Sequence, residues 1–332
     1  LGDIGKKIHT ARSRNDQVLV SIQLYLINEL TQIKKEVKSL FDLLIILAKK
    51  NKDAIMPGYT HMKAAMPSSF GLWFSAFAEI LIDDIISLNS TIKIVNQNTL
   101  GSAAGYGTSF NIDRNFTTKD LNFLTLKYNS LACQISRNKI EKNTFDTLGN
   151  IAFTLSKISM DICLYLGDEF QFISFPDDIT TGSSIMPHKK NPDVFEIIRG
   201  KCNNIQNLSN SISLSSTNLP SGYHRDFQLN KGKIIDAVIE IKECIKILSY
   251  CLSKIKVNKK ILEKSNYENI FSVELINEMV MQGIPFRDAY LKLKNKLSEG
   301  KIKVPKKVNY SHIGSIGNLA LDKIKLKMKE NY

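Results

Sequence analysis

Apolar residues recur along most of this chain of 332 residues at the spacing of an amphipathic helix. From Ser13 to Lys50 the intervals between them are mostly three and four residues, without interruption. A helix of that length would extend roughly 50 Å, at about 1.5 Å per residue. So long a helix indicates a bundle, which can also extend between subunits.

The same spacing predicts four further long helices, over residues 68–95, about 139–166, 193 to about 214, and 229–255. Ser68 or Ser69 is suited to cap the first of them, and a smaller, more polar helical tail follows the last. No stretch alternates between apolar and polar residues for long enough to predict a sheet. The predicted fold class is therefore all-α, a long-helix bundle with a small helical C-terminal domain.

Two loops interrupt this pattern. The stretch from Met56 to His61 breaks the chain between the first two helices, and a loop of small residues runs from Gly101 to Gly107. Small side chains there would allow close backbone packing. A plain turn between helices and a role in binding both remain open for this second loop.

Composition describes an ordinary soluble globular protein, with 43% hydrophobic and 23% charged residues. No apolar run is long enough to span a membrane, so we expect no membrane partner. The five cysteines are odd in number and widely spaced, which favours buried free thiols in a reducing cytoplasm over disulfides or a zinc site: Cys133, Cys163, Cys202, Cys244 and Cys251. The first residue is Leu1, and we expect the sequence to begin inside a longer protein.

The net charge of +13 raises the question of a nucleic-acid partner. The lysines are, however, scattered among isoleucine and asparagine along the helical pattern and form no single tract. A solvated basic surface explains such a distribution, and we expect no nucleic-acid partner.

Three polar segments stand at the ends of the predicted helices: His9–Gln17, Pro57–Lys63 and Thr181–Asp193. In the third, Asn191 and Pro192 precede an amphipathic run and predict an N-cap followed by proline at the first helical position. The positive end of that helix would face the serines and lysines of the loop, an arrangement suited to a substrate rich in carboxylates.

Each segment also has a structural explanation when taken singly. The third could be a basic surface loop, His61 could cap a helix or lie in a core, and Arg12 and Arg14 could be surface charges. Three such clusters at the ends of very long helices are a much rarer coincidence, which favours a functional site.

In order along the chain, these segments resemble the three characteristic regions of the aspartase/fumarase superfamily. The run from Gly182 to Asp193 is close to the superfamily signature, Gly-Ser-Ser-x-Met-Pro-x-Lys-Lys-Asn-Pro-Asp. The run from His9 to Val18 is close to His-Thr-Gly-Arg-Ser-Arg-Asn-Asp-Gln-Val, which is characteristic of the argininosuccinate lyases. Residues 57–61, 198–201 and 219–223 agree, and the resemblance runs essentially from end to end.

The resemblance implies reversible cleavage of argininosuccinate to arginine and fumarate by base-catalysed β-elimination, the last step of arginine biosynthesis. It implies Ser183 as the base, with Lys189 stabilising its alkoxide and the carbanion, and His61 as the acid for the departing nitrogen, paired with Glu196. The residues implied to bind substrate are Arg14, Asn15, Thr60, Asn191, Tyr223, Gln228 and Lys231. No metal or organic cofactor is implied.

The resemblance also implies a homotetramer whose active sites are shared between subunits. Within such an assembly the chain would comprise a remnant of an N-terminal domain at residues 1–12, a central bundle domain with the catalytic loops at 13–258, and a small helical C-terminal domain at 259–332.

Some positions depart from the family pattern. Ala11 replaces the usual glycine, and Lys63 stands where glutamine is typical, which affects the expected substrate affinity more than the reaction type. The alternatives are a sister lyase acting on adenylosuccinate, fumarate or aspartate, and a non-catalytic structural homologue. The run from His9 to Gln17 argues against the first, and the joint presence of His61, Ser183, Lys189 and Asn191 argues against the second.

Overall fold

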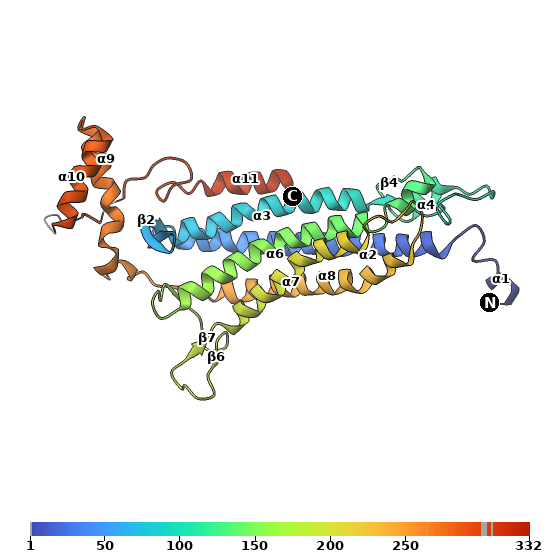
Figure 1. Ribbon diagram of the computed structural model, residues 1–332, viewed down its shortest axis with the longest axis horizontal. Coiled ribbons are helices and arrows are strands. Elements are labelled where there is room, and N and C mark those ends of the chain that lie inside the picture. Colours follow the sequence, from blue (N-terminus) through green and yellow to red (C-terminus); the bar gives the residue numbers. More distant parts are fainter. Residues whose placement is uncertain (1, 264, 300–303, 307) are drawn as a thin grey trace.

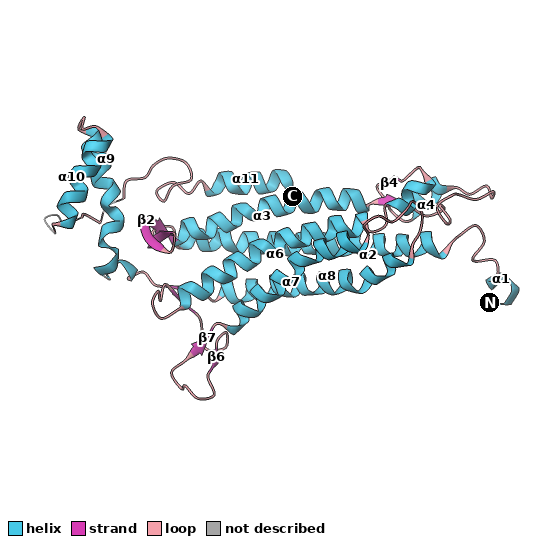
Figure 2. Ribbon diagram, viewed as in Figure 1, coloured by secondary structure: helices cyan, strands magenta, loops and turns pink. Residues whose placement is uncertain are grey.

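The computed structural model describes residues 2–263, 265–299, 304–306 and 308–332. Five long helices lie roughly along one axis (Figure 1): α2 (Arg14–Lys50), α3 (Phe70–Val95), α6 (Lys139–Leu166), α7 (Asp193–Ser215) and α8 (Lys231–Ser253). The predicted all-α bundle is confirmed, and Figure 2 shows how little of the described chain is strand.

The core of the bundle is formed by the apolar stripes that the spacing predicted. On α2, Leu26, Leu30 and Ile33 are fully buried, as are Leu81 and Ile85 on the neighbouring α3. Each such side chain contributes about 1.5–3 kcal/mol by leaving water. Burial of these stripes is therefore the main force that holds the five helices together.

Two helices begin at serine caps, and the second of these caps was suggested by the sequence. Ser13 caps α2 in a capping box with Asp16, and the Ser69 hydroxyl accepts the backbone N–H of Leu72 at 3.0 Å at the start of α3. The predicted cap of α7 is wrong by one residue. Asn191 lies in a short strand, the cap position is Pro192, and the helix begins at Asp193.

The physical reason for that correction is the pairing of two short strands, β6 (Thr181–Gly182) and β7 (Lys190–Asn191). Their antiparallel pairing closes the signature loop and holds Asn191 in extended backbone. The Thr181 hydroxyl donates to the Asp193 carboxylate, so a side chain from the opposite strand meets the first turn of α7.

A β-hairpin between α2 and α3 was not predicted. It consists of β1 (Ile55–Thr60) and β2 (Lys63–Ser69), with Pro57 opposite Pro67 and a bulge at Gly58 and Tyr59. The two prolines and the bulge remove the alternating pattern by which strands are recognised in sequence. Three pairs of two-residue strands complete the described β structure: β3 (Gln97–Asn98) with β4 (Thr125–Leu126), β5 (Ile173–Ser174) with β8 (Lys256–Val257), and β6 with β7.

The shorter helices lie at the ends and along one side of the bundle. They are α1 (Gly2–Gly5), α4 (Arg114–Asp120), α5 (Ser130–Ile135), α9 (Ser272–Met281), α10 (Phe286–Ser298) and α11 (Leu321–Asn331), with the 3-10 helices η1 (Arg225–Asn230), η2 (Ile261–Glu263) and η3 (Ser265–Phe271). Helices α9 and α10 lie beyond the hairpin end, whereas α11 returns along α3 (Figure 1). Because α11 packs along a helix of the bundle, the positions of these helices do not test the predicted domain boundary at residue 258. That boundary stays a prediction.

All five cysteines are free; four are buried and Cys163 is half-buried. This agrees with the expected free thiols. Among the described residues, no helix combines the length and the apolar character needed to cross a membrane.

Candidate active site

The first turn of α2 is fixed by the buried carboxylate of Asp16. It accepts the backbone N–H groups of Ser13 at 3.1 Å, Gly101 at 3.0 Å and Ala103 at 2.9 Å. The small-residue loop is thereby tied against the start of α2, which is the close packing that its composition allowed. This arrangement fixes the backbone that carries Arg14 and Asn15.

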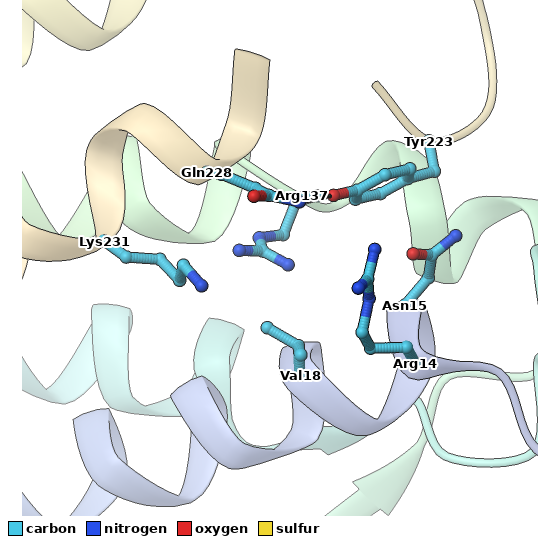
Figure 3. A pocket seen from close by; sticks show the side chains of 7 residues that line it. All are labelled: Arg14, Asn15, Val18, Arg137, Tyr223, Gln228 and Lys231. Carbon is cyan, nitrogen blue, oxygen red and sulfur yellow. Dashed lines mark hydrogen bonds between the residues drawn. The ribbon is translucent and has the colours of Figure 1, made fainter. Parts of the chain in front are cut away.

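Five of the residues predicted to bind substrate line one cavity of about 120 Å³ at this end of the bundle (Figure 3). Arg14 and Asn15 come from α2, Gln228 from η1, Lys231 from the start of α8, and Tyr223 from the loop before η1. The Gln228 side-chain amide donates to the Tyr223 hydroxyl at 2.5 Å. Segments more than 200 positions apart in sequence thus meet at one site.

The cavity is electropositive. Three cations line it, Arg14, Lys231 and Arg137, and no acidic side chain does. Such a site suits a carboxylate, because a negative ligand is attracted by the charges of Arg14 and Lys231, whereas the charge of Arg137 is balanced by Glu141. Arg137 was not predicted to belong to a site, because it lies outside the three polar segments. The sequence feature that could have drawn attention to it is Glu141, four residues later, at the spacing of an ion pair on a helix.

The tip of the β1–β2 hairpin carries Thr60 and His61, both exposed. Thr60 pairs with Lys63, so His61 and Met62 form a two-residue turn, with φ of 52° and 61°. Positive φ at both positions is the type I′ conformation, in which asparagine and glycine are usual. Side chains with a Cβ are strained there, by about 1–3 kcal/mol each, and such strain is commonly found at functional sites.

The hairpin is anchored by Tyr59. Its ring packs against Phe170 and Phe172, and its hydroxyl donates to Tyr267 at 3.2 Å. Burial raises the pKa of Tyr59, and the hydrogen bond to Tyr267 adds to the shift. The base of the hairpin is therefore packed against neighbouring segments, while His61 at its tip is exposed.

Ser183 lies in the loop closed by β6 and β7, which extends away from the bundle (Figure 1). Its hydroxyl oxygen accepts the backbone N–H groups of Met186 at 3.1 Å and Ile185 at 3.4 Å. These donors would stabilise negative charge on that oxygen. Lys189, in the same loop, is exposed, whereas Lys190 is paired with Asp177.

Glu196 is exposed in the first turn of α7. The hydrogen bonds and ion pairs of the described residues include none between Glu196 and His61. Its pairing with His61 thus stays a prediction.

One chain does not bring the three polar segments together. Arg14 and Asn15 are at the N-terminal end of α2, whereas the hairpin with His61 follows its C-terminal end (Figure 1). A helix of 37 residues separates them by about 55 Å, at 1.5 Å per residue. Within the described chain, the cavity at the start of α2 therefore lies far from the hairpin that carries His61.

One departure from the family pattern has a visible structural consequence. Ala11, where glycine is usual, has φ of 60°, a left-handed conformation that glycine adopts without strain. Lys63, the other departure, is exposed directly beside the turn of His61 and adds a cation there.

The fold is shared with solved lyases. The structure of EDDS lyase in complex with formate matches with a TM-score of 0.84 at 21% identity, covering 99% of this chain and 74% of that one. Class II fumarase from Schistosoma mansoni matches with a TM-score of 0.72 at 18% identity, covering 97% of this chain and 71% of that one. At these identities the likeness establishes the fold alone.

The sequence comparisons are more specific. Residues 1–207 match the model of the lyase family. The argininosuccinate lyase of Phocaeicola vulgatus is 50% identical over 330 residues, and that of Bacteroides thetaiotaomicron is 48% identical, each match covering 99% of this chain and 74% of the relative. This confirms the resemblance seen in the motifs: the chain belongs to the argininosuccinate lyase family.

Proposed function

We propose that this protein is an argininosuccinate lyase, which cleaves argininosuccinate reversibly to arginine and fumarate in the cytoplasm as the last step of arginine biosynthesis. The observation that carries the proposal is the cavity at the start of α2, where Arg14, Lys231 and three neutral polar side chains converge without an acidic neighbour. A substrate with several carboxylates fits that charge, and the relatives named above carry the same activity in their names.

In the proposed reaction, Ser183 removes a proton from Cβ of the succinyl group. The electron pair of that C–H bond forms the double bond of fumarate as the Cα–N bond breaks, and the nitrogen departs with the electron pair of the Cα–N bond. Charge builds on the neighbouring carboxylate before the bond breaks. Lys189, Asn191 and the N-terminal end of α7 are suited to stabilise it.

Serine is a weak base at neutral pH, so its alkoxide needs support. The two backbone N–H groups that already point at the Ser183 oxygen supply part of it, and Lys189 would supply a charge. His61 would protonate the departing nitrogen from the other side, with Glu196 of a second chain favouring its charged form. Thr60 and Asn15 would hold substrate carboxylates.

We further propose a homotetramer in which each active site takes its segments from different chains. The wide separation of the cavity from the catalytic loops within one chain supports this. Large apolar side chains are also exposed on the bundle helices, among them Phe153 on α6, Ile197 on α7 and Ile239 on α8. Apolar surface of this kind is typical of a face covered by a partner.

The experiment that tests the function follows fumarate absorbance with argininosuccinate, adenylosuccinate, malate and aspartate offered separately. We expect fumarate from argininosuccinate alone. Release from one of the other three would identify a sister lyase instead, and release from none would leave a non-catalytic homologue.

The proposed roles of Ser183 and His61 can be tested in the same assay. We expect Ser183→Ala and His61→Asn each to lower kcat about a hundredfold or more, because each removes a proton-transfer group. The matched controls remove the same chemical groups at exposed positions: Ser184→Ala next to Ser183 in the same loop, and His312→Asn in the C-terminal part of the chain. Both should stay within about tenfold of the parent. Near-normal turnover in either test variant would contradict its assigned role.

A further inference from the structure

Arg137 is the buried member of the cation set around the cavity. It stands in the junction between α5 and α6, and 4% of its surface is exposed. Its Nε donates to Glu141 at 2.8 Å, and both side chains of this pair are almost completely buried. Among the described residues, its Nη2 atom has no hydrogen-bond partner.

A buried guanidinium nitrogen without a partner is unusual in a folded protein and calls for an explanation. Figure 3 shows that the terminal nitrogens of Arg137 point into the cavity, toward the space between Arg14 and Lys231. Only Nε, at the back of the group, is used by Glu141. The two-pronged end of the guanidinium is thus held facing the place where a ligand would bind.

We propose that Arg137 is a further substrate-binding residue, which receives one carboxylate of the substrate on its terminal nitrogens at the floor of this cavity. The inference rests on the proposed lyase function and adds a residue to its site. Two parallel N–H donors match the two oxygens of a carboxylate, a geometry that lysine cannot reproduce.

The charge of the cavity selects the carboxylate over the other groups of the substrate. Argininosuccinate carries carboxylates at both ends, together with an ammonium and a guanidinium group. Its cationic groups would be repelled by Arg14 and Lys231, and no acidic side chain lines the cavity to receive them. The bound carboxylate therefore belongs either to the part that leaves as arginine or to the part that leaves as fumarate.

A purely structural role would make a different prediction. If Arg137 served only to pair with Glu141, its Nε and its charge would be sufficient, and its terminal nitrogens would not matter. Arg137→Lys separates the two roles, because it keeps the positive charge near Glu141 and removes the two-pronged end. Replacing one member of a buried pair can also impair folding, so a second variant is needed.

That second variant is Arg137→Met with Glu141→Leu, which replaces the whole pair by apolar side chains of similar volume. Such replacements of buried pairs are commonly neutral or stabilising. For both variants we expect an unchanged oligomer and a KM for argininosuccinate raised about tenfold or more, with a smaller change in kcat. A KM within about twofold of the parent in a folded variant would overturn the proposal.

Glu141→Gln is the matched control. It removes the charge of the partner but leaves an acceptor for Nε and leaves the terminal nitrogens facing the cavity. We expect it to change stability while KM stays within about threefold of the parent. An increase in KM equal to that of Arg137→Lys would show that Arg137 acts only through the packing of α6, and would overturn the proposal.

Direct binding identifies the source of the carboxylate and is independent of turnover. Arginine and fumarate are titrated separately into the parent protein and Arg137→Lys by calorimetry. Loss of affinity for arginine alone or for fumarate alone, by about tenfold, assigns the carboxylate to that product. Equal affinities of the two proteins for both products would overturn the role of Arg137, whereas failure of the parent to cleave argininosuccinate would overturn the proposed function instead.

Discussion

Asp84 shows how one buried carboxylate can set the pH dependence of this fold. It lies on the face of α3 that packs against α6, is 4% exposed, and accepts the hydroxyl of Thr154 at 2.9 Å. Burial raises the pKa of Asp84 to about 6; the Thr154 bond opposes the shift, and the neighbouring charge of Asp83 adds to it. At neutral pH the folded protein therefore holds an unfavourable buried charge.

The sign of the effect follows from proton linkage. Because the pKa is higher in the folded than in the unfolded chain, the folded state binds the proton more tightly, and stability falls as the pH rises from about 4 to 6. We expect Asp84→Asn to raise the free energy of unfolding by about 2 kcal/mol at pH 7.5 and to have little effect at pH 4. Urea denaturation at one protein concentration and both pH values measures this.

Asp83→Asn is the control for that prediction. Asp83 is exposed one position earlier on the same helix, so its substitution should change stability by no more than about 0.5 kcal/mol at either pH. An equal gain from Asp84→Asn at both pH values would mean that burial of its charge is not the cause.

At the scale of single residues, the motifs named several side chains that the structure brings together, while their roles stay predictions. Arg14, Tyr223 and Lys231 were named from the motifs, and they do line one cavity. Arg137 was missed because its importance depends on burial and direction, which one isolated arginine in a sequence does not reveal. The bonds from Asp16 to the small-residue loop were missed for the same reason, since they join positions 85 and 87 residues apart.

At the scale of elements, the β1–β2 turn holds two consecutive non-glycine residues, His61 and Met62, at positive φ. We expect Met62→Gly to stabilise the hairpin by about 1 kcal/mol, because glycine removes the steric cost of φ at 61°. Amide hydrogen exchange of the β1 and β2 strands measures this local stability.

Met66→Gly provides a matched control on the same hairpin. Met66 lies within β2, where the backbone is extended and glycine gives no relief, so this substitution should weaken the hairpin. If both glycine variants changed exchange in the same direction, strain at the turn would not explain the effect.

The elements themselves differ in how far the sequence predicted them. Long amphipathic helices such as α2 and α6 produce a repeated spacing of apolar residues in the sequence. Their existence and most of their ends were therefore predicted. The hairpin depends on pairing between strands that contain Pro57 and Pro67, and local pattern carries no sign of it. The start of α7 was misplaced because strand pairing, which is also non-local, competes with the capping of the helix by Asn191.

At the scale of the whole molecule, the sequence predicted the bundle and the segments of the site, while the described chain leaves those segments apart. No local pattern specifies which segments of different chains meet. The resemblance to the argininosuccinate lyases supplied the shared-site homotetramer, and the separation along α2 gives that proposal a physical basis.

The shared-site proposal predicts complementation between inactive variants. When Ser183→Ala and His61→Asn proteins are mixed, dissociated and reassociated, some sites would combine an intact serine from one chain with an intact histidine from another. Random mixing in equal amounts makes about a quarter of the sites intact in a homotetramer. We therefore expect activity near that fraction of the parent protein, measured as fumarate release.

The control mixes two variants of one segment, Ser183→Ala and Lys189→Met. Both residues lie in the loop between β6 and β7, so each site receives the pair from a single chain and no mixture can restore it. We expect no recovery there, although hybrids form equally well. Recovery in this control would mean that activity returns although no chain carries both Ser183 and Lys189 intact. Complementation could then not be attributed to the sharing of sites between chains. No recovery from the Ser183→Ala and His61→Asn mixture, with hybrids verified by mass spectrometry, would mean that serine and histidine act from the same chain, and a monomer by light scattering would exclude shared sites altogether.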